Sequence, residues 1–221
     1  MDWIPVAVEK RRRYDASHGD LDERALVRRG NTAYAAALAL TMAGDPEAAG
    51  WFRNAGDAWR ESWDAGAADD RWGRPIGVLK AALLAGDGVE PSAAWTLSLG
   101  AADARSPIGR YAAVLALLAC GRRDEAGPLA ASLDDFPDDV AAALAAIAAG
   151  DVDAYGAAVD SVVASFDTRA AHLEDVAVAD TALVLDALAR RNGVERALPA
   201  SSTLPVARKG RRSRSSGGTR S

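Results

Sequence analysis

The sequence predicts an all-α fold, an irregular α-α array of about ten helices. Apolar residues recur at separations of three and four, the spacing that aligns one face of a helix. Alternating apolar and polar residues, which mark a half-buried strand, form no run of useful length. Glycine closes four of the apolar segments, at Gly44, Gly86, Gly121 and Gly150, and aspartate follows three of these glycines.

The chain is organised around a predicted helical hairpin, residues 31–66. Alanines line its first arm, and Phe52, Trp59 and Trp63 fall on one stripe of its second arm. Between the arms, Gly44 can adopt the left-handed conformation that ends a helix, and the following Asp-Pro pair suits the start of the next helix. Because small residues let the helices approach closely and large rings bury much surface, we expect this hairpin to nucleate the core.

Two predicted helices precede the second arm. The first spans Trp3 to Ala16, and its basic run, residues 10–13, is interpreted as a solvated face. Asp20 followed by Glu23 has the form of a capping box, which would open the helix that continues into the hairpin. Gly30 is expected to kink this helix.

Seven more helices are predicted after the irregular connection between Gly66 and Arg74. Prolines start the first three of them, and a serine cap precedes the proline of the third, at Ser106 and Pro107. The next is a short helix over residues 122–133, bent at its Gly-Pro pair. Of the last three, one ends at Gly150, one carries Tyr155 to Phe166, and one runs from about Glu174 to Arg191.

Charge divides the chain into two predicted parts. The net charge is −5, but residues 206–221 hold six basic side chains and no acidic one, so residues 1–205 carry −11. We therefore predict a single helical domain over residues 1–205 and a basic disordered tail over residues 206–221. The acidic domain argues against a nucleic-acid-binding surface. No apolar run approaches the roughly 20 residues of a membrane span, and no signal peptide is recognisable, so we expect a cytoplasmic protein.

The sequence offers little for catalysis or metal binding. Its two histidines, His18 and His172, have no partner at ligand spacing, and Cys120 is alone. The glycines lie at helix ends, so no phosphate-binding loop is present, and no nucleophile-elbow sequence occurs. We therefore predict no catalytic residue, no metal and no cofactor, and we place Cys120 in the core as a small apolar residue.

The densest acidic cluster has two interpretations. One is a site for a divalent cation or a basic partner, and the other, which we favour, is helix capping and solvation. It consists of Asp134, Asp135, Asp138 and Asp139.

A tryptophan in a polar loop also has two interpretations. Trp72 either folds back over the core, which we favour, or is offered to a partner. Asp69 and Asp70 lie beside it in the loop. Together with the four aspartates above, these three residues are the predicted partner-binding residues.

A series of segments in the second half of the chain suggests a family. These are residues 76–87, 110–121, 148–155 and 185–193, followed by a short closing motif at 202–205. In this order they resemble immunity family 49 of bacterial polymorphic-toxin systems, over residues 75–205. The sequence departs from the family pattern at Tyr155, where phenylalanine is expected, and at Phe166 to Arg169, which replaces an aromatic-histidine region.

The resemblance implies an all-helical, non-enzymatic protein that neutralises a cognate toxin by binding it, and it transfers no catalytic residue. The architecture would be tetratricopeptide-like. The glycine stops lie 42, 35 and 29 residues apart, so the regular repeat of roughly 34 residues is absent.

The leading hypothesis is thus a binding module that engages another protein, a toxin domain among the candidates, through a groove or an acidic face. One alternative is an adaptor whose tail, residues 206–221, contacts nucleic acid or an acidic partner. Another is an enzyme or small-ligand-binding protein with a pocket near Asp57, Arg60 and Trp63.

Overall fold

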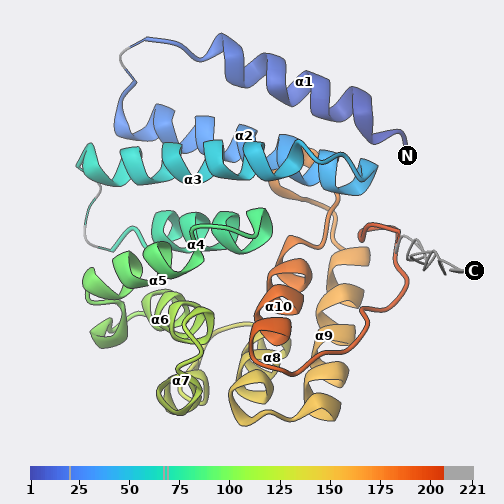
Figure 1. Ribbon diagram of the computed structural model, residues 1–221. Coiled ribbons are helices and arrows are strands. Elements are labelled where there is room, and N and C mark those ends of the chain that lie inside the picture. The colour runs from blue at the N-terminus through green and yellow to red at the C-terminus, as the bar shows by residue number, and fades with distance from the viewer. Residues whose placement is uncertain (20, 67, 69, 207–221) are drawn as a thin grey trace, which may run out of the picture.

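The computed structural model describes residues 1–19, 21–66, 68 and 70–206. Over these residues the chain forms ten α-helices and no strand, which confirms the predicted all-α fold (Figure 1). The helices are α1 (Trp3–Ala16), α2 (Glu23–Ala43), α3 (Ala48–Asp64), α4 (Gly73–Ala85), α5 (Val89–Ser98), α6 (Pro107–Ala119), α7 (Arg123–Ala130), α8 (Asp138–Ala149), α9 (Val152–Asp167) and α10 (Asp180–Arg191). Two 3-10 turns lie at Ala101–Asp103 and Leu173–Asp175.

The predicted basic tail lies almost entirely outside the described residues. Of residues 206–221, only Val206 is described, and its side chain is exposed. Asp20 and Asp69 also lie outside the described part of the chain.

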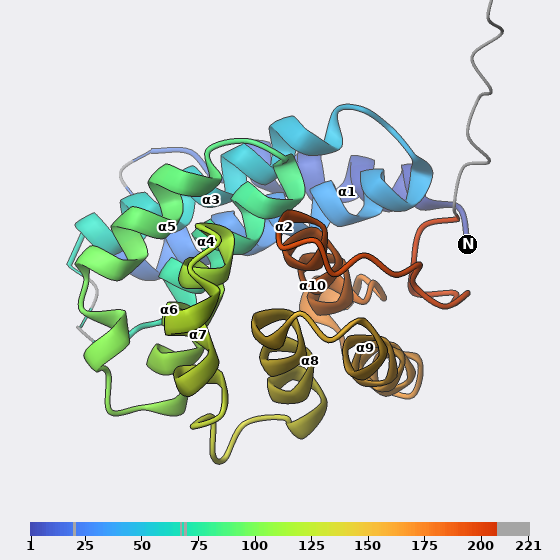
Figure 2. The ribbon, with the colours of Figure 1, turned by 60° about the horizontal axis from the view of Figure 1, so that its bottom comes forward.

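Successive helices pack against each other from α1 to α9, and α10 breaks this order. The first three helices lie side by side in one layer (Figure 1). α10 packs on α4, α6, α8 and α9, in the centre of the molecule (Figure 2). In an open repeat array each unit contacts only its neighbours. The last helix therefore closes this array on itself, which differs from the arrangement expected for a tetratricopeptide-like stack.

The predicted helix ends are confirmed where a glycine or a proline fixes the backbone. Gly44 ends α2 with a φ of 67°, in the left-handed region. Ser106 caps α6, because its side chain accepts a hydrogen bond of 3.1 Å from the backbone N–H of Gly109, and Pro107 is the first residue of that helix.

Other boundaries were predicted wrongly. Asp22 caps α2, because its carboxylate accepts a bond of 2.7 Å from the N–H of Ala25. α10 begins at Asp180, six residues later than predicted. Glu174 and Asp175 have positive φ values of 51° and 60°, which interrupt any helix there.

The segment before α10 is bonded to the chain that follows α10, residues 192–206, which we call the C-terminal arm. Ala179 donates a backbone hydrogen bond of 2.9 Å to the carbonyl of Thr203. Val176 and Val178, two residues apart, are both buried in this stretch. Tertiary contacts with the arm have therefore replaced the first turns of the predicted helix.

The core consists of more than the hairpin. One apolar cluster joins α2, α3 and α4 around the rings of Tyr34, Phe52 and Trp59. A larger cluster fills the space between α6, α8, α9 and α10. Cys120, expected in the core, is exposed, because α6 ends at this residue and Gly121 turns the chain away. The hairpin is therefore one of two centres of packing.

Trp59 is held between two helical glycines. A Cβ on Gly30 of α2 would lie 2.6 Å from the indole Nε1, and a Cβ on Gly77 of α4 would lie 2.6 Å from Cε3. The indole N–H also donates a hydrogen bond of 3.2 Å to the side-chain oxygen of Asn31. Gly30 lies inside an unbroken α2, so the predicted kink is wrong, and the glycine instead makes room for the ring.

Replacing either of these glycines with alanine should destabilise the fold, although alanine is the better helix former. Gly30→Ala or Gly77→Ala is expected to lower the free energy of unfolding by about 1–3 kcal/mol, because the new methyl group overlaps the indole. The matched control is Gly50→Ala in α3, where no atom lies within 4 Å of the added Cβ. It should raise stability by about 0.5–1 kcal/mol. Urea unfolding measures all three, and a stabilised Gly30→Ala protein would contradict the packing argument.

Candidate functional site

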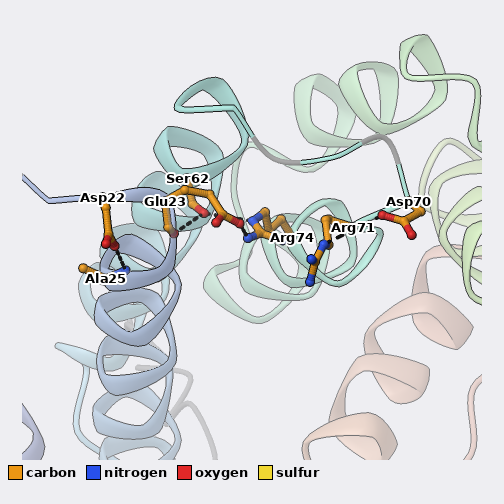
Figure 3. A network of polar contacts seen from close by, with 7 residues as sticks. All are labelled: Asp22, Glu23, Ala25, Ser62, Asp70, Arg71 and Arg74. Atoms are coloured by element: carbon orange, nitrogen blue, oxygen red, sulfur yellow. Dashed lines mark hydrogen bonds and ion pairs between the residues drawn. The ribbon is translucent and has the colours of Figure 1, made fainter.

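A buried polar network joins the start of α2, the end of α3 and the start of α4 (Figure 3). Arg74 is buried, forms an ion pair with Glu23 and donates a hydrogen bond of 2.8 Å from Nε to Ser62 Oγ. The Ser62 hydroxyl in turn donates to the carbonyl of Glu23, at 2.8 Å. Burial lowers the pKa of Arg74. Because every member of this network has a partner, it positions three helices and leaves no group free for chemistry.

A second polar cluster fixes the central helix. Lys80 of α4 donates hydrogen bonds to Asp180 Oδ2 at 2.9 Å and to Thr181 Oγ1 at 3.2 Å, at the start of α10. The hydroxyl of Tyr34 in α2 donates to the same oxygen of Asp180 at 3.2 Å. Sequence analysis did not single out this cluster, although Lys80 is a charged residue inside the apolar run 76–85.

The pKa values of the cation and of the phenol in this cluster are both shifted. Burial alone would lower the pKa of Lys80, but the attraction of Asp180, with Tyr111 nearby, outweighs it and the pKa is raised. Burial, and then the negative charge of Asp180, raises the pKa of Tyr34 well above its ordinary value. Lys80 therefore stays charged and Tyr34 stays neutral at neutral pH, as suits a structural ion pair.

The hollow nearest to the predicted ligand pocket lies between α3, α4 and the start of α5. It has a volume of about 240 Å³ and includes Asp57 and Arg60 in its lining. Trp63, the third residue predicted there, does not line it. Trp63 instead packs edge-on against Trp95, with ring centroids 6.1 Å apart. The lining residues that the sequence did not indicate are chiefly Phe52 and Gly56 of α3 and, across the helix interface, Val78 of α4.

The predicted tryptophan is folded back over the core. Trp72 is 7% exposed, and its ring packs next to Gly109 and lies 6.4 Å from the ring of Trp63. This burial argues against Trp72 as an exposed anchor. Asp70 is exposed and lies 3.8 Å from Arg71, at the edge of the polar network (Figure 3).

The predicted acidic cluster forms the connection between α7 and α8. Asp134, Asp135 and Asp138 are exposed, and Asp139 is half-buried. Asp139 accepts a hydrogen bond of 2.8 Å from the N–H of Val140, in the first turn of α8. No ion pair involves any of the four within the described chain. We call these four residues the acidic connection.

Trp72 and the acidic connection, two parts of the predicted partner-binding set, both lie near the first half of α6. Phe136 follows Asp135 of the acidic connection, and its ring lies 4.6 Å from that of Tyr111 in α6. The ring of Trp72 packs next to Gly109 of the same helix.

Over the part of the chain that the structure describes, no group of three or more acidic, histidine or cysteine side chains could hold a metal ion. In the same residues, no helix is both long and apolar enough to span a bilayer.

Comparison with models of known families, with curated protein sequences and with solved structures gave no match. The resemblance to immunity family 49 therefore stays a prediction.

Asp180→Asn should destabilise the protein strongly, because it leaves the charged Lys80 in a largely buried place without its counter-ion. We expect the free energy of unfolding at pH 7 to fall by about 3–5 kcal/mol. The matched control is Glu125→Gln, which removes one partner of an exposed pair with Arg122 and should leave stability close to that of the parent. Urea unfolding measures both, and equal effects would show that Asp180 is not essential to the packing of α10.

Stability should also decrease at alkaline pH. The folded protein holds the protons of Lys80 and Tyr34 more tightly than the unfolded chain does, since both pKa values are raised. Their contribution to the free energy of unfolding is complete below about pH 10, where both groups are protonated in the unfolded chain too. This contribution is lost as the pH rises through the folded-state pKa values. Urea unfolding of the parent and of a Lys80→Met/Asp180→Leu variant measures the free energy of unfolding from neutral to alkaline pH. This free energy should decrease more steeply with pH for the parent. Equal slopes would contradict this linkage.

Proposed function

We propose that this chain is a non-enzymatic module that binds another protein, with the acidic connection as its contact surface. The observation that carries the proposal is the exposure of Asp134, Asp135 and Asp138 without a cationic partner in the described chain. Some carboxylates elsewhere on the surface are paired, as Glu125 is with Arg122 and Asp160 is with Arg196. Others, such as Asp57 and Asp64, are not, but the acidic connection brings three exposed and unpaired carboxylates together within five positions of the chain. The unpaired ones keep their charge available for a basic partner.

The charge of the whole domain supports the same conclusion. Residues 1–205 carry a net charge of −11, which attracts basic proteins over a distance and speeds their encounter. Specificity would come from the fixed positions of the carboxylates, because Asp139 is held at the first turn of α8 by its bond to Val140.

The sequence resemblance gives this proposal a biological setting. A basic toxin domain, such as a nuclease, would be bound and neutralised in the cytoplasm. The buried ion pairs of Arg74 and Lys80 support a non-enzymatic role, because each has its partner inside the protein and neither lines the hollow described above.

The test is removal of three charges at the acidic connection. The variant Asp134→Asn/Asp135→Asn/Asp138→Asn keeps side-chain shape, and asparagine tolerates the positive φ of 58° at position 135. Its capture of the partner from native lysate, quantified by mass spectrometry, should fall roughly tenfold at low salt. The difference should shrink as added salt screens the charges.

The matched control removes the same number of charges from exposed sites elsewhere, Asp15→Asn/Asp64→Asn/Asp103→Asn. Equal losses of capture in both variants would mean that the net charge of the domain, and not the acidic connection, controls binding. Unchanged capture by the first variant would refute the acidic connection as the contact surface.

A further inference from the structure

The hollow between α3, α4 and α5 has an apolar floor. Phe52, Val78 and Ala81 form it, and these side chains are 2%, 6% and 1% exposed. Gly56 leaves it open, since a Cβ at this position would meet only the methyl group of Ala81, at 3.7 Å, and the carbonyl of Val78, at 4.0 Å. The volume of about 240 Å³ is below the roughly 300–1,000 Å³ of typical ligand pockets, so the hollow suits a small molecule.

The rim of the hollow carries four charged side chains, of which two are paired with each other. Arg53 lies 3.6 Å from Asp87, so these two charges compensate. Asp57 is exposed and has neither an ion pair nor a hydrogen bond among the described residues, and Arg60 has no acidic partner there. One negative and one positive charge therefore remain available, three positions apart on α3, where side chains are neighbours.

The guanidinium of Arg60 stacks on an aromatic ring. The guanidinium of Arg60 lies over the ring of Trp95, 4.1 Å from the ring centroid. The ring of Trp63 packs against the ring of Trp95, with the two centroids 6.1 Å apart. Stacking occupies the face of the guanidinium and leaves its N–H groups at the edge, which match the two oxygens of a carboxylate.

We propose that this hollow binds a free α-amino acid with an apolar side chain. The ammonium group would lie against Asp57, the carboxylate against Arg60 and the side chain on the floor formed by Phe52, Val78 and Ala81. Only a free amino acid carries both charges on one α-carbon, since a residue within a peptide has neither. The balanced charges of the rim disfavour phosphorylated ligands, which need a cationic site.

The test is calorimetric titration of the full chain with L-leucine and L-phenylalanine. Three further probes each lack one feature: N-acetyl-L-leucine the cation, L-leucinamide the carboxylate, and glycine the side chain. We expect at least one of the two amino acids to bind with a Kd below about 1 mM, and each truncated probe to bind about tenfold more weakly or not at all. Absence of binding up to about 10 mM would overturn the proposal, as would equal binding of N-acetyl-L-leucine.

Three variants locate the site. Gly56→Leu should fill the hollow and abolish binding, while a preserved thermal unfolding transition shows that the protein is folded. Asp57→Asn and Arg60→Gln should each weaken binding of the amino acid about tenfold, and Arg60→Gln should remove the difference between L-leucine and L-leucinamide. Asp64→Asn, an exposed acid further along α3 that does not line the hollow, is the matched control and should bind as the parent does. Binding that survives Gly56→Leu would place the ligand elsewhere and overturn the assignment.

Discussion

The indole of Trp59 sets the spacing of the helices on which the other features depend. It extends from α3 and fills the space between Gly30 of α2 and Gly77 of α4, so the ring sets the distance between these two helices. Any side chain larger than hydrogen at either position would push a helix outward. This spacing brings the start of α4 against the start of α2 and the end of α3, where Arg74 reaches both Glu23 and Ser62. The network in Figure 3 is therefore a consequence of close packing around one tryptophan.

The position of α10 follows from a different interaction. A helix at the end of a repeat array normally covers one end of the stack, but here its first residue is drawn to Lys80 of α4. The C-terminal arm then returns across α9, where Asp167 accepts hydrogen bonds from Ser201 Oγ at 2.6 Å and Thr203 Oγ1 at 2.9 Å. These contacts close the array. They also explain why the chain from Val176 to Ala179 is not helical, because the N–H of Ala179 is bonded to the carbonyl of Thr203 in the arm.

The sequence predicted those helix ends that depend on neighbouring residues. It did not predict the features that depend on a residue far away in the chain. Gly44 and Ser106 act on their own neighbours, so the C-terminal end of α2 and the start of α6 were predictable. Gly30 looked like a helix breaker because its partner, Trp59, is 29 residues away. The start of α10 was placed too early because the bond from Ala179 to Thr203 joins segments that no periodicity connects. Helix number and type were thus accessible, whereas the closure by α10 was not.

The same distinction applies to the candidate sites. Exposure of the acidic connection follows from its composition, and Asp57 and Arg60 were predicted to lie near a pocket. Their common hollow was not predictable in detail, because its floor comes partly from α4, and Trp95 rather than Trp63 lies under Arg60. The burial of Trp72 likewise depends on Gly109, which lies 37 positions further along the chain.

The three glycines that face helix interfaces around α3 explain why one of these interfaces is hollow. Gly30 and Gly77 are both covered by the ring of Trp59, whereas Gly56 faces only a methyl group and a carbonyl at 3.7 and 4.0 Å. Protein interiors leave few voids, because atoms that line a void lose attractive contacts. Phe52 and Val78 line the hollow with the little surface that they leave exposed. An apolar side chain placed there would cover this surface and fill the hollow, and the two charges without partners at the rim would fix the orientation of the ligand.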